Sequence, residues 1–173
     1  MNWDKYYLDL CKTVSTNSKC LSRKIGSIIV LDKSIISTGY NGPPRGVPPC
    51  DERWAKDKYL MKKWDEIMRG VTHGDIDFSK CPRYILGYKS GQGLDICIAG
   101  HAERNALVNA ARHGISIKGA TLYLDTVVCC KDCMIEIINA GIIEVVCTDL
   151  TYYDCQTEYL VKESGIKVRK YEL

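Results

Sequence analysis

The stretch "GATLYLDTVVCCKDCMIEIINAGIIEVVCTD", residues 119–149, decides the fold class. Residues 119–126 and residues 142–149 have the short, alternating or β-branched pattern of strands. Residues 131–141, which lie between them, have the apolar spacing of a helix and end on a glycine, a common helix stop. A strand, a helix and a strand of these lengths predict an α/β layered domain built on βαβ units.

The same alternation continues on both sides of this stretch. Further helices are predicted over residues 2–20, 102–114 and 155–165. Further strands are predicted over residues 25–32, 34–41 and 166–173. The first two of these strands meet at Asp32-Lys33, which indicates a hairpin. No internal repeat and no linker-like break interrupts the pattern, so we expect a single domain over residues 1–173.

An insertion around residues 42–97 is the exception to the alternation. Residues 41–49, "NGPPRGVPP", hold four of the five prolines and two glycines, so they form a loop, and a rigid loop beside a strand end often carries function. Residues 51–70 have the spacing of one amphipathic helix that ends at Gly70. Residues 71–97 are polar and glycine-rich, as in an insertion or a long loop.

Length and composition limit the class of protein. A chain of 173 residues is large enough to bury a core as one domain, and its net charge is +3 with Lys and Arg scattered along it. That distribution argues against an extended nucleic-acid surface but not against a small anionic substrate. Residues 1–10 lack a signal-peptide layout and no apolar run reaches membrane length, so we expect a cytoplasmic protein without a membrane partner.

Ten cysteines in that compartment are more often metal ligands, catalytic groups or small buried apolar residues than disulfides. Cys11 and Cys147 fit the last use. The cluster of Cys129, Cys130 and Cys133 allows three interpretations: a metal clip, a redox dithiol or a small disulfide staple.

A second motif discriminates among these interpretations. His101 precedes the helix predicted from residue 102, and Glu103 lies in the first turn of that helix. Cys130 and Cys133 also lie at a strand-to-helix junction, and the carboxyl ends of strands in an α/β sheet meet at a common crevice. His101, Cys130 and Cys133 can therefore converge on one metal ion.

Three protein ligands and an open fourth position are typical of catalytic zinc, which activates a bound water. The helix N-terminus at Cys130 favours the thiolate form. Glu103 is then a non-ligand carboxylate that can accept and donate protons. This is the arrangement of zinc nucleobase deaminases, with H-x-E followed by P-C-x-x-C.

With these residues the chain resembles the cytidine/deoxycytidylate deaminase superfamily, and most closely the deoxycytidylate (dCMP) deaminases. The resemblance covers nearly the whole chain and rests on "SKCLSRKIGSIIV", "IISTGYNGPPRG", "PPCDE", "HAERNAL" and "CCKDC". It implies a three-layer α/β/α sandwich around a mixed sheet of roughly five strands. One departure is Cys129, which stands where the family usually has a proline that fixes the turn.

The resemblance also implies the reaction, which converts dCMP to dUMP and ammonia and so supplies dUMP for dTMP synthesis. Glu103 takes the proton of the attacking water, protonates N3 of the pyrimidine and helps the amino group leave. The implied substrate contacts are Asn41 at the sugar, Tyr153 beside the nucleotide, Ala102, and Arg104 or Arg23 at the 5′-phosphate. Each of these also has an ordinary structural interpretation, as a turn asparagine, a packed tyrosine or a solvated arginine.

Regulation and assembly are further implications. Family members are commonly homo-hexamers that dCTP activates and dTTP inhibits, with Mg²⁺ as a companion of the triphosphate. The residues that resemble the effector site are Gly42, Pro43, Arg45 and Gly46. The alternative is a surface loop stiffened by proline.

A second, structural zinc is implied by relatives that have ligands at the positions of Cys20 and Cys50. We infer Cys81 and Cys97 as the other two ligands, because four thiolates would make a closed tetrahedral site. The alternative is four unrelated buried thiols. For the protein as a whole, the alternatives are a deaminase of dCTP or tRNA adenosine, and a non-enzymatic zinc module or redox dithiol protein.

Overall fold

The structure is a computed structural model that describes residues 2–72, 74 and 76–171. The chain forms two compact units. The first unit takes in residues 2–18, 25–41 and 101–171, and the second takes in residues 19–24 and the described part of 42–100. The segment expected as an insertion therefore makes up most of the second unit.

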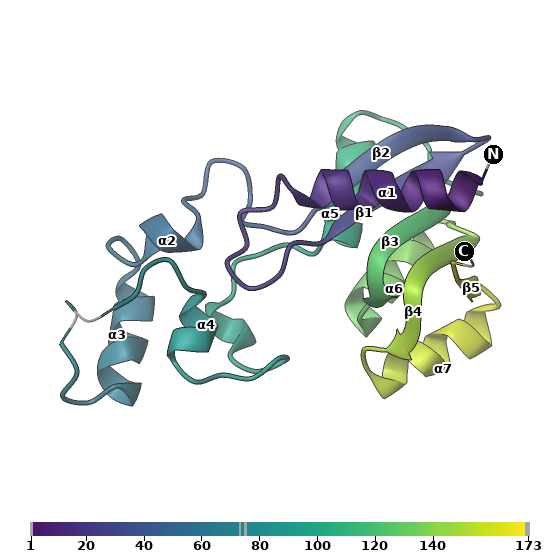
Figure 1. The fold of residues 1–173 in the computed structure, drawn as a ribbon. Coiled ribbons are helices and arrows are strands. Elements are labelled where there is room, and N and C mark those ends of the chain that lie inside the picture. The colour runs from purple at the N-terminus through teal and green to yellow at the C-terminus, as the bar shows by residue number, and fades with distance from the viewer. Residues whose placement is uncertain (1, 73, 75, 172–173) are drawn as a thin grey trace. The chain divides into compact units, whose positions relative to one another are not determined.

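The first unit is built on a mixed five-stranded sheet with strand order β2-β1-β3-β4-β5 (Figure 1). The strands are β1 Gly26–Leu31, β2 Ser34–Tyr40, β3 Thr121–Val128, β4 Glu144–Tyr152 and β5 Lys167–Lys170. β1 pairs antiparallel with β2 and with β3, whereas β3–β4 and β4–β5 are parallel. The two parallel pairs confirm the expected βαβ units, and the predicted end of the last strand at residues 172–173 lies outside the described residues.

The predicted hairpin is confirmed at Asp32 and Lys33, which both have positive φ angles of 48° and 61°. Such a pair forms the tight turn that matches the twist of two antiparallel strands.

Helices cover both faces of the sheet. Helix α1, Trp3–Ser15, packs Tyr7, Leu8 and Cys11 against a strand face that includes Ile28 and Tyr123. Helices α5 Ala102–Arg112, α6 Lys131–Asn139 and α7 Cys155–Ser164 belong to the opposite layer. Because strand side chains alternate between faces, neighbouring positions of β1 serve the two different cores. The expected three-layer α/β/α sandwich is confirmed.

Helix α5 lies close to β2 because Gly39 has no side chain. A Cβ atom at Gly39 would lie 2.3 Å from both the carbonyl oxygen of Ala102 and the backbone nitrogen of Ala106. Glycine at this position therefore brings the first turn of α5 directly against the edge strand.

The second unit has its own small core, which is formed by Trp54, Leu60, Trp64, Ile76, Leu86 and Ile96. Its helices are α2 Cys50–Arg53, α3 Lys58–Ile67, α4 Pro82–Ile85 and the 3₁₀ turn η2 Leu94–Ile96. The single helix predicted over residues 51–70 is wrong, since Asp57 caps a new helix by accepting hydrogen bonds from the backbone N–H groups of Tyr59 and Leu60. Residues 71–97 are not simply a long loop, because part of this segment packs into the core.

In the described part of the chain, no helix has both the length and the apolar character needed to cross a membrane.

Candidate active site

The starts of α5 and α6 carry the chemistry-bearing side chains of the first unit. His101 is the N-cap residue of α5, and Cys130 is the N-cap residue of α6, two residues after β3 ends at Val128. Both caps have extended backbone, so each chain turns sharply into its helix. Cys133 lies one turn into α6, which brings its thiol to the same end of that helix as Cys130.

His101, Cys130 and Cys133 converge on one point. The Nδ1 atom of His101 lies 3.4 Å from the Sγ atom of Cys130 and 3.3 Å from the Sγ atom of Cys133, and all three ligand atoms lie within 4.8 Å of one another. Ligands of a tetrahedral zinc ion with Zn–N near 2.0 Å and Zn–S near 2.3 Å are separated by about 3.5 Å. The donor set and its spacing therefore fit zinc. Within residues 2–72, 74 and 76–171, no other group of three or more His, Cys, Asp or Glu side chains meets this distance.

The hydrogen bonds and the burial of the two thiols shift their pKa values. Hydrogen bonds from Cys133 and His101 lower the pKa of the Cys130 thiol. The hydrogen bond with Cys130, together with burial, raises the pKa of Cys133. The hydrogen bond with Cys130 also raises the pKa of His101. A bound cation would replace these protons.

Glu103 is a buried carboxyl group beside the three ligands. It lies in the first turn of α5 and is only 6% exposed. Burial raises its pKa, so its carboxylate is a stronger base than that of an exposed glutamate. A group in this state can both accept and donate a proton, as general acid–base catalysis requires.

Cys129 is not one of the three residues whose ligand atoms converge. It belongs to the apolar core beneath the helices, as Cys133 also does, and is 4% exposed. Burial raises the pKa of its thiol.

Asn41 is held firmly at the end of β2. Its Oδ1 atom accepts hydrogen bonds from the hydroxyl of Ser18 and from the backbone N–H of Ile25, both at 2.8 Å. These bonds fix the plane of the side-chain amide. Ala102, the other expected substrate contact in this region, is buried in the first turn of α5.

Arg104 is engaged with Glu136. Its Nε and Nη2 atoms contact the two carboxylate oxygens of Glu136 at 3.0 and 2.9 Å, a bidentate pair that joins α5 to α6. This partner makes Arg104 a weaker candidate for a phosphate contact. Glu136 has no recognisable motif in the sequence, so it could not have been predicted.

Tyr153 is exposed at the end of β4, directly before the start of α7. The next residue, Asp154, was not predicted as a site residue. Its carboxylate accepts hydrogen bonds from the starts of both α6 and α7, at the backbone nitrogens of Lys131 and Thr157. The sequence does offer one signal for this role, because an aspartate directly before a helix predicted from residue 155 is a typical N-cap residue.

The remaining expected residues lie in the second unit. They are Arg23, Gly42, Pro43, Arg45 and Gly46 of the substrate and effector sets, and Cys20, Cys50, Cys81 and Cys97 of the second metal set. Arg45 is exposed, and Gly46 has a positive φ of 78°. Burial raises the pKa of Cys50 to about 11, and charge on Cys81 and Cys97 adds to this effect, so these three thiols are electrostatic neighbours.

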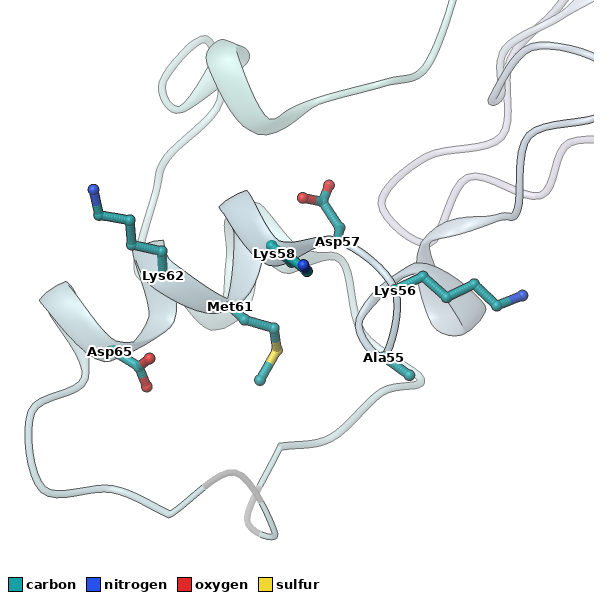
Figure 2. A pocket seen from close by; sticks show the side chains of 7 residues that line it. All are labelled: Ala55, Lys56, Asp57, Lys58, Met61, Lys62 and Asp65. Carbon is teal, nitrogen blue, oxygen red and sulfur yellow. The ribbon is translucent and has the colours of Figure 1, made fainter.

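A shallow pocket in the second unit contains none of the expected site residues (Figure 2). Its lining includes Met61, Asp65 and the lysines at positions 56, 58 and 62. The side chains of Lys56 and Lys62 extend away from each other in this view, so they do not converge on one ligand (Figure 2).

The fold and the site together define a class, an α/β/α protein that presents a His–Cys–Cys metal site at two helix starts. The family model described as the cytidine and deoxycytidylate deaminase zinc-binding region matches residues 1–149. The chain therefore belongs to the cytidine and deoxycytidylate deaminase family.

Named relatives agree with this assignment. The chain is 34% identical over 166 residues to the deoxycytidylate deaminase of Enterobacteria phage T2, covering 93% of this chain and 88% of the phage protein. It is 31% identical over 170 residues to the deoxycytidylate deaminase of Schizosaccharomyces pombe, covering 98% of this chain and 44% of that protein. The chain thus spans less than half the length of this fungal relative.

A solved structure supports the fold. The apo crystal structure of dCMP deaminase from the cyanophage S-TIM5 matches with a TM-score of 0.64 at 24% identity, covering 97% of this chain and 96% of that chain.

Proposed function

We propose that this protein catalyses the hydrolytic deamination of dCMP to dUMP and ammonia. The observation that carries the proposal is the convergence of His101, Cys130 and Cys133 beside the buried carboxyl group of Glu103. The named relatives support the substrate, because the phage T2 protein and the fungal proteins are deoxycytidylate deaminases. The cyanophage enzyme with the same fold has been crystallised with dCMP and dUMP.

His101, Cys130 and Cys133 would hold the zinc ion. When bound, zinc supplies Lewis acidity and lowers the pKa of a coordinated water, so that the water can attack a carbon atom near neutral pH. The remaining steps belong to the chain's own residues.

Glu103 moves the protons of the reaction. It accepts one from the attacking water and delivers it to N3 of the pyrimidine as C4 becomes tetrahedral. It then takes the proton of the new C4 hydroxyl and gives it to the amino group, so that the C4–N4 bond breaks, ammonia leaves and the C4 carbonyl of dUMP forms. Burial suits Glu103 to the first role because a raised pKa makes the carboxylate a stronger base toward the attacking water, and the protonated group that results can then deliver the proton. Such catalysis contributes roughly 10²–10⁴-fold to the rate.

Residues at the strand ends and helix starts would orient the substrate. The fixed amide of Asn41 would hydrogen-bond the sugar, Ala102 would line the base, and the ring of Tyr153 would flank the nucleotide. Arg104, which pairs with Glu136, and Arg23 are the two candidates for the 5′-phosphate. A guanidinium group suits a phosphate because it can donate two parallel hydrogen bonds.

Regulation is proposed for the loop of Gly42, Pro43, Arg45 and Gly46. Its glycines would let the backbone approach a triphosphate, and the exposed guanidinium of Arg45 would pair with it. On this proposal dCTP, with Mg²⁺, activates a homo-hexamer and dTTP inhibits it. The product dUMP would enter dTMP synthesis in the cytoplasm.

A second zinc is proposed at Cys20, Cys50, Cys81 and Cys97. The charge effects of Cys81 and Cys97 on the thiol of Cys50 support it. Two zinc ions per chain in a metal analysis would support this site, whereas one would contradict it.

A substrate panel tests the proposal. Initial rates would be measured with dCMP, dCTP, deoxycytidine and an RNA that carries the target adenosine. We expect dCMP to have the highest kcat/KM. A preference for dCTP or RNA would show that dCMP is not the main substrate. No turnover of any of the four compounds would favour a zinc module or a redox dithiol protein.

A further inference from the structure

Asp154 connects the metal-ligand helix to its neighbour. It follows β4 and is the N-cap residue of α7. Its Oδ1 atom accepts hydrogen bonds from the backbone N–H of Thr157 at 2.8 Å and from the Thr157 hydroxyl at 3.1 Å. Its Oδ2 atom accepts a hydrogen bond from the backbone N–H of Lys131 at 3.0 Å. A single carboxylate therefore caps the starts of both α6 and α7.

The bond to Lys131 matters because of the residue that precedes it. Lys131 is the first residue of α6, and Cys130 is the N-cap, whose side chain makes no capping hydrogen bond. The first N–H groups of a helix need acceptors from outside the helix. Asp154 supplies one, while the Cys130 thiol is directed toward His101 at 3.4 Å. Asp154 thus holds the peptide that directly follows Cys130 from outside α6.

Thr157 keeps Asp154 in this position. Thr157 is fully buried, and it donates to Asp154 through both its backbone N–H and its hydroxyl. These two bonds fix the carboxylate, so its second oxygen remains aimed at the Cys130–Lys131 peptide. Groups that orient metal ligands from outside the coordination sphere typically change metal affinity or activity by about 10–100-fold when removed.

We propose that Asp154 is a positioning residue of the metal site, which fixes the Cys130–Lys131 peptide and so the direction of the Cys130 thiol. This inference rests on one part of the proposed function, namely that the site binds zinc. It adds a residue from a third helix to a site whose expected members all come from α5 and α6.

The variants Asp154→Ala and Asp154→Asn test the inference, with Asp149→Ala as the matched control. Asp149 also accepts a backbone and a hydroxyl hydrogen bond from a threonine two residues later, Thr151, but these bonds are local and the residue is exposed. Zinc affinity would be measured by competition with a chromophoric chelator. Thiolate geometry would be followed by the absorption spectrum of the cobalt-substituted protein.

We expect Asp154→Ala to weaken zinc binding about 10-fold and to change the cobalt–thiolate absorption. Asp154→Asn retains one acceptor oxygen and should give a smaller change, and Asp149→Ala should match the wild type. Equal zinc affinity and equal cobalt spectra for Asp154→Ala and Asp149→Ala would overturn the inference. If Asp154→Ala does not fold, a wild-type result for Asp154→Asn in both assays overturns it. Absence of dCMP turnover by the wild type would count against the proposed function only, because neither assay depends on activity.

Discussion

At the scale of single residues, the surroundings of three neighbouring thiols determine their chemistry. Cys130 and Cys133 face His101, and the pKa of Cys130 is lowered by the hydrogen bonds it receives. Cys129 faces the apolar core, and burial raises its pKa. All three thiols adjoin the same apolar core, and only Cys130 and Cys133 have sulfur atoms close to the ring of His101, so we expect these two rather than Cys129 to bind a cation.

Alanine substitutions of adjacent cysteines should separate these roles. Cys130→Ala removes one of three ligands, so we expect loss of the catalytic zinc on dialysis and loss of activity. Cys129→Ala removes only a buried sulfur, so we expect zinc content to be unchanged and stability to fall by about 1 kcal/mol or somewhat more. Zinc per chain would be measured by elemental analysis. Equal zinc loss from both variants would contradict the assignment of ligands.

At the scale of secondary-structure elements, the close approach of β2 and α5 controls where His101 and Glu103 lie. Gly39 permits this approach, because a Cβ atom there would lie 2.3 Å from backbone atoms of α5. Backbone atoms cannot rotate away as a side chain can, so an added methyl group must displace the helix itself.

Gly39→Ala should therefore destabilise the protein and disturb the site together. We expect the free energy of unfolding to fall by about 1–3 kcal/mol, as for other overpacked positions, and kcat/KM for dCMP to fall as well. Gly74→Ala is the control, since its nearest neighbour is 3.9 Å away. Chemical denaturation would measure the free energy of unfolding of both variants, and initial rates with dCMP would give their kcat/KM. Equal midpoints for the two variants would show that the helix tolerates the displacement.

The sequence predicted most of these elements because local signals define them. Glycines at 114, 141 and 165 end the three helices of the metal-site layer in left-handed conformations, as expected of helix stops. The break between α2 and α3 was missed because the apolar spacing of residues 51–70 continues through it. Asp57 starts a new helix by capping α3, although the apolar spacing itself does not change there.

The metal ligands of the site could be predicted from the sequence, but the residues that hold the ligand helices in place could not. The pattern H-x-E and C-x-x-C indicates a metal site because each half marks a helix start. Glu136 and Asp154 support that site through contacts over 32 and 23 positions of sequence. No local pattern encodes such contacts, because they depend on how the helices pack.

At the scale of the whole molecule, an ion-pair network joins the two ends of the first unit. Asp4 of α1 forms a bidentate pair with Arg169 of β5 and accepts a hydrogen bond from the Tyr123 hydroxyl at 2.7 Å. Arg169 also pairs with Glu144 at 3.0 Å. The hydrogen bonds from Arg169 hold the pKa of Asp4 below its usual value despite partial burial.

This network should make stability depend on acid pH. Because the folded-state pKa of Asp4 is lowered, its contribution is complete above the unfolded-state pKa of about 4 and is lost as pH falls through the folded-state value. We expect Asp4→Asn to lower the free energy of unfolding by about 1 kcal/mol at pH 7, a modest value because the pair is partly exposed.

The difference between the wild type and Asp4→Asn should shrink as the pH falls below about 4. Denaturation midpoints at several pH values would measure it, with the exposed Glu163→Gln as control. A difference that stays constant with pH would show that the aspartate acts through packing rather than charge.

The deamination chemistry assigned to Glu103 underlies the whole account, and one measurement tests it most directly. The rate of dUMP formation from dCMP would be compared for the wild type and Glu103→Gln at equal, independently measured zinc content. The account predicts at least a 10²-fold loss of rate with zinc retained, since the amide keeps the shape of the side chain but cannot shuttle a proton. A Glu103→Gln protein that forms dUMP at the wild-type rate would contradict it.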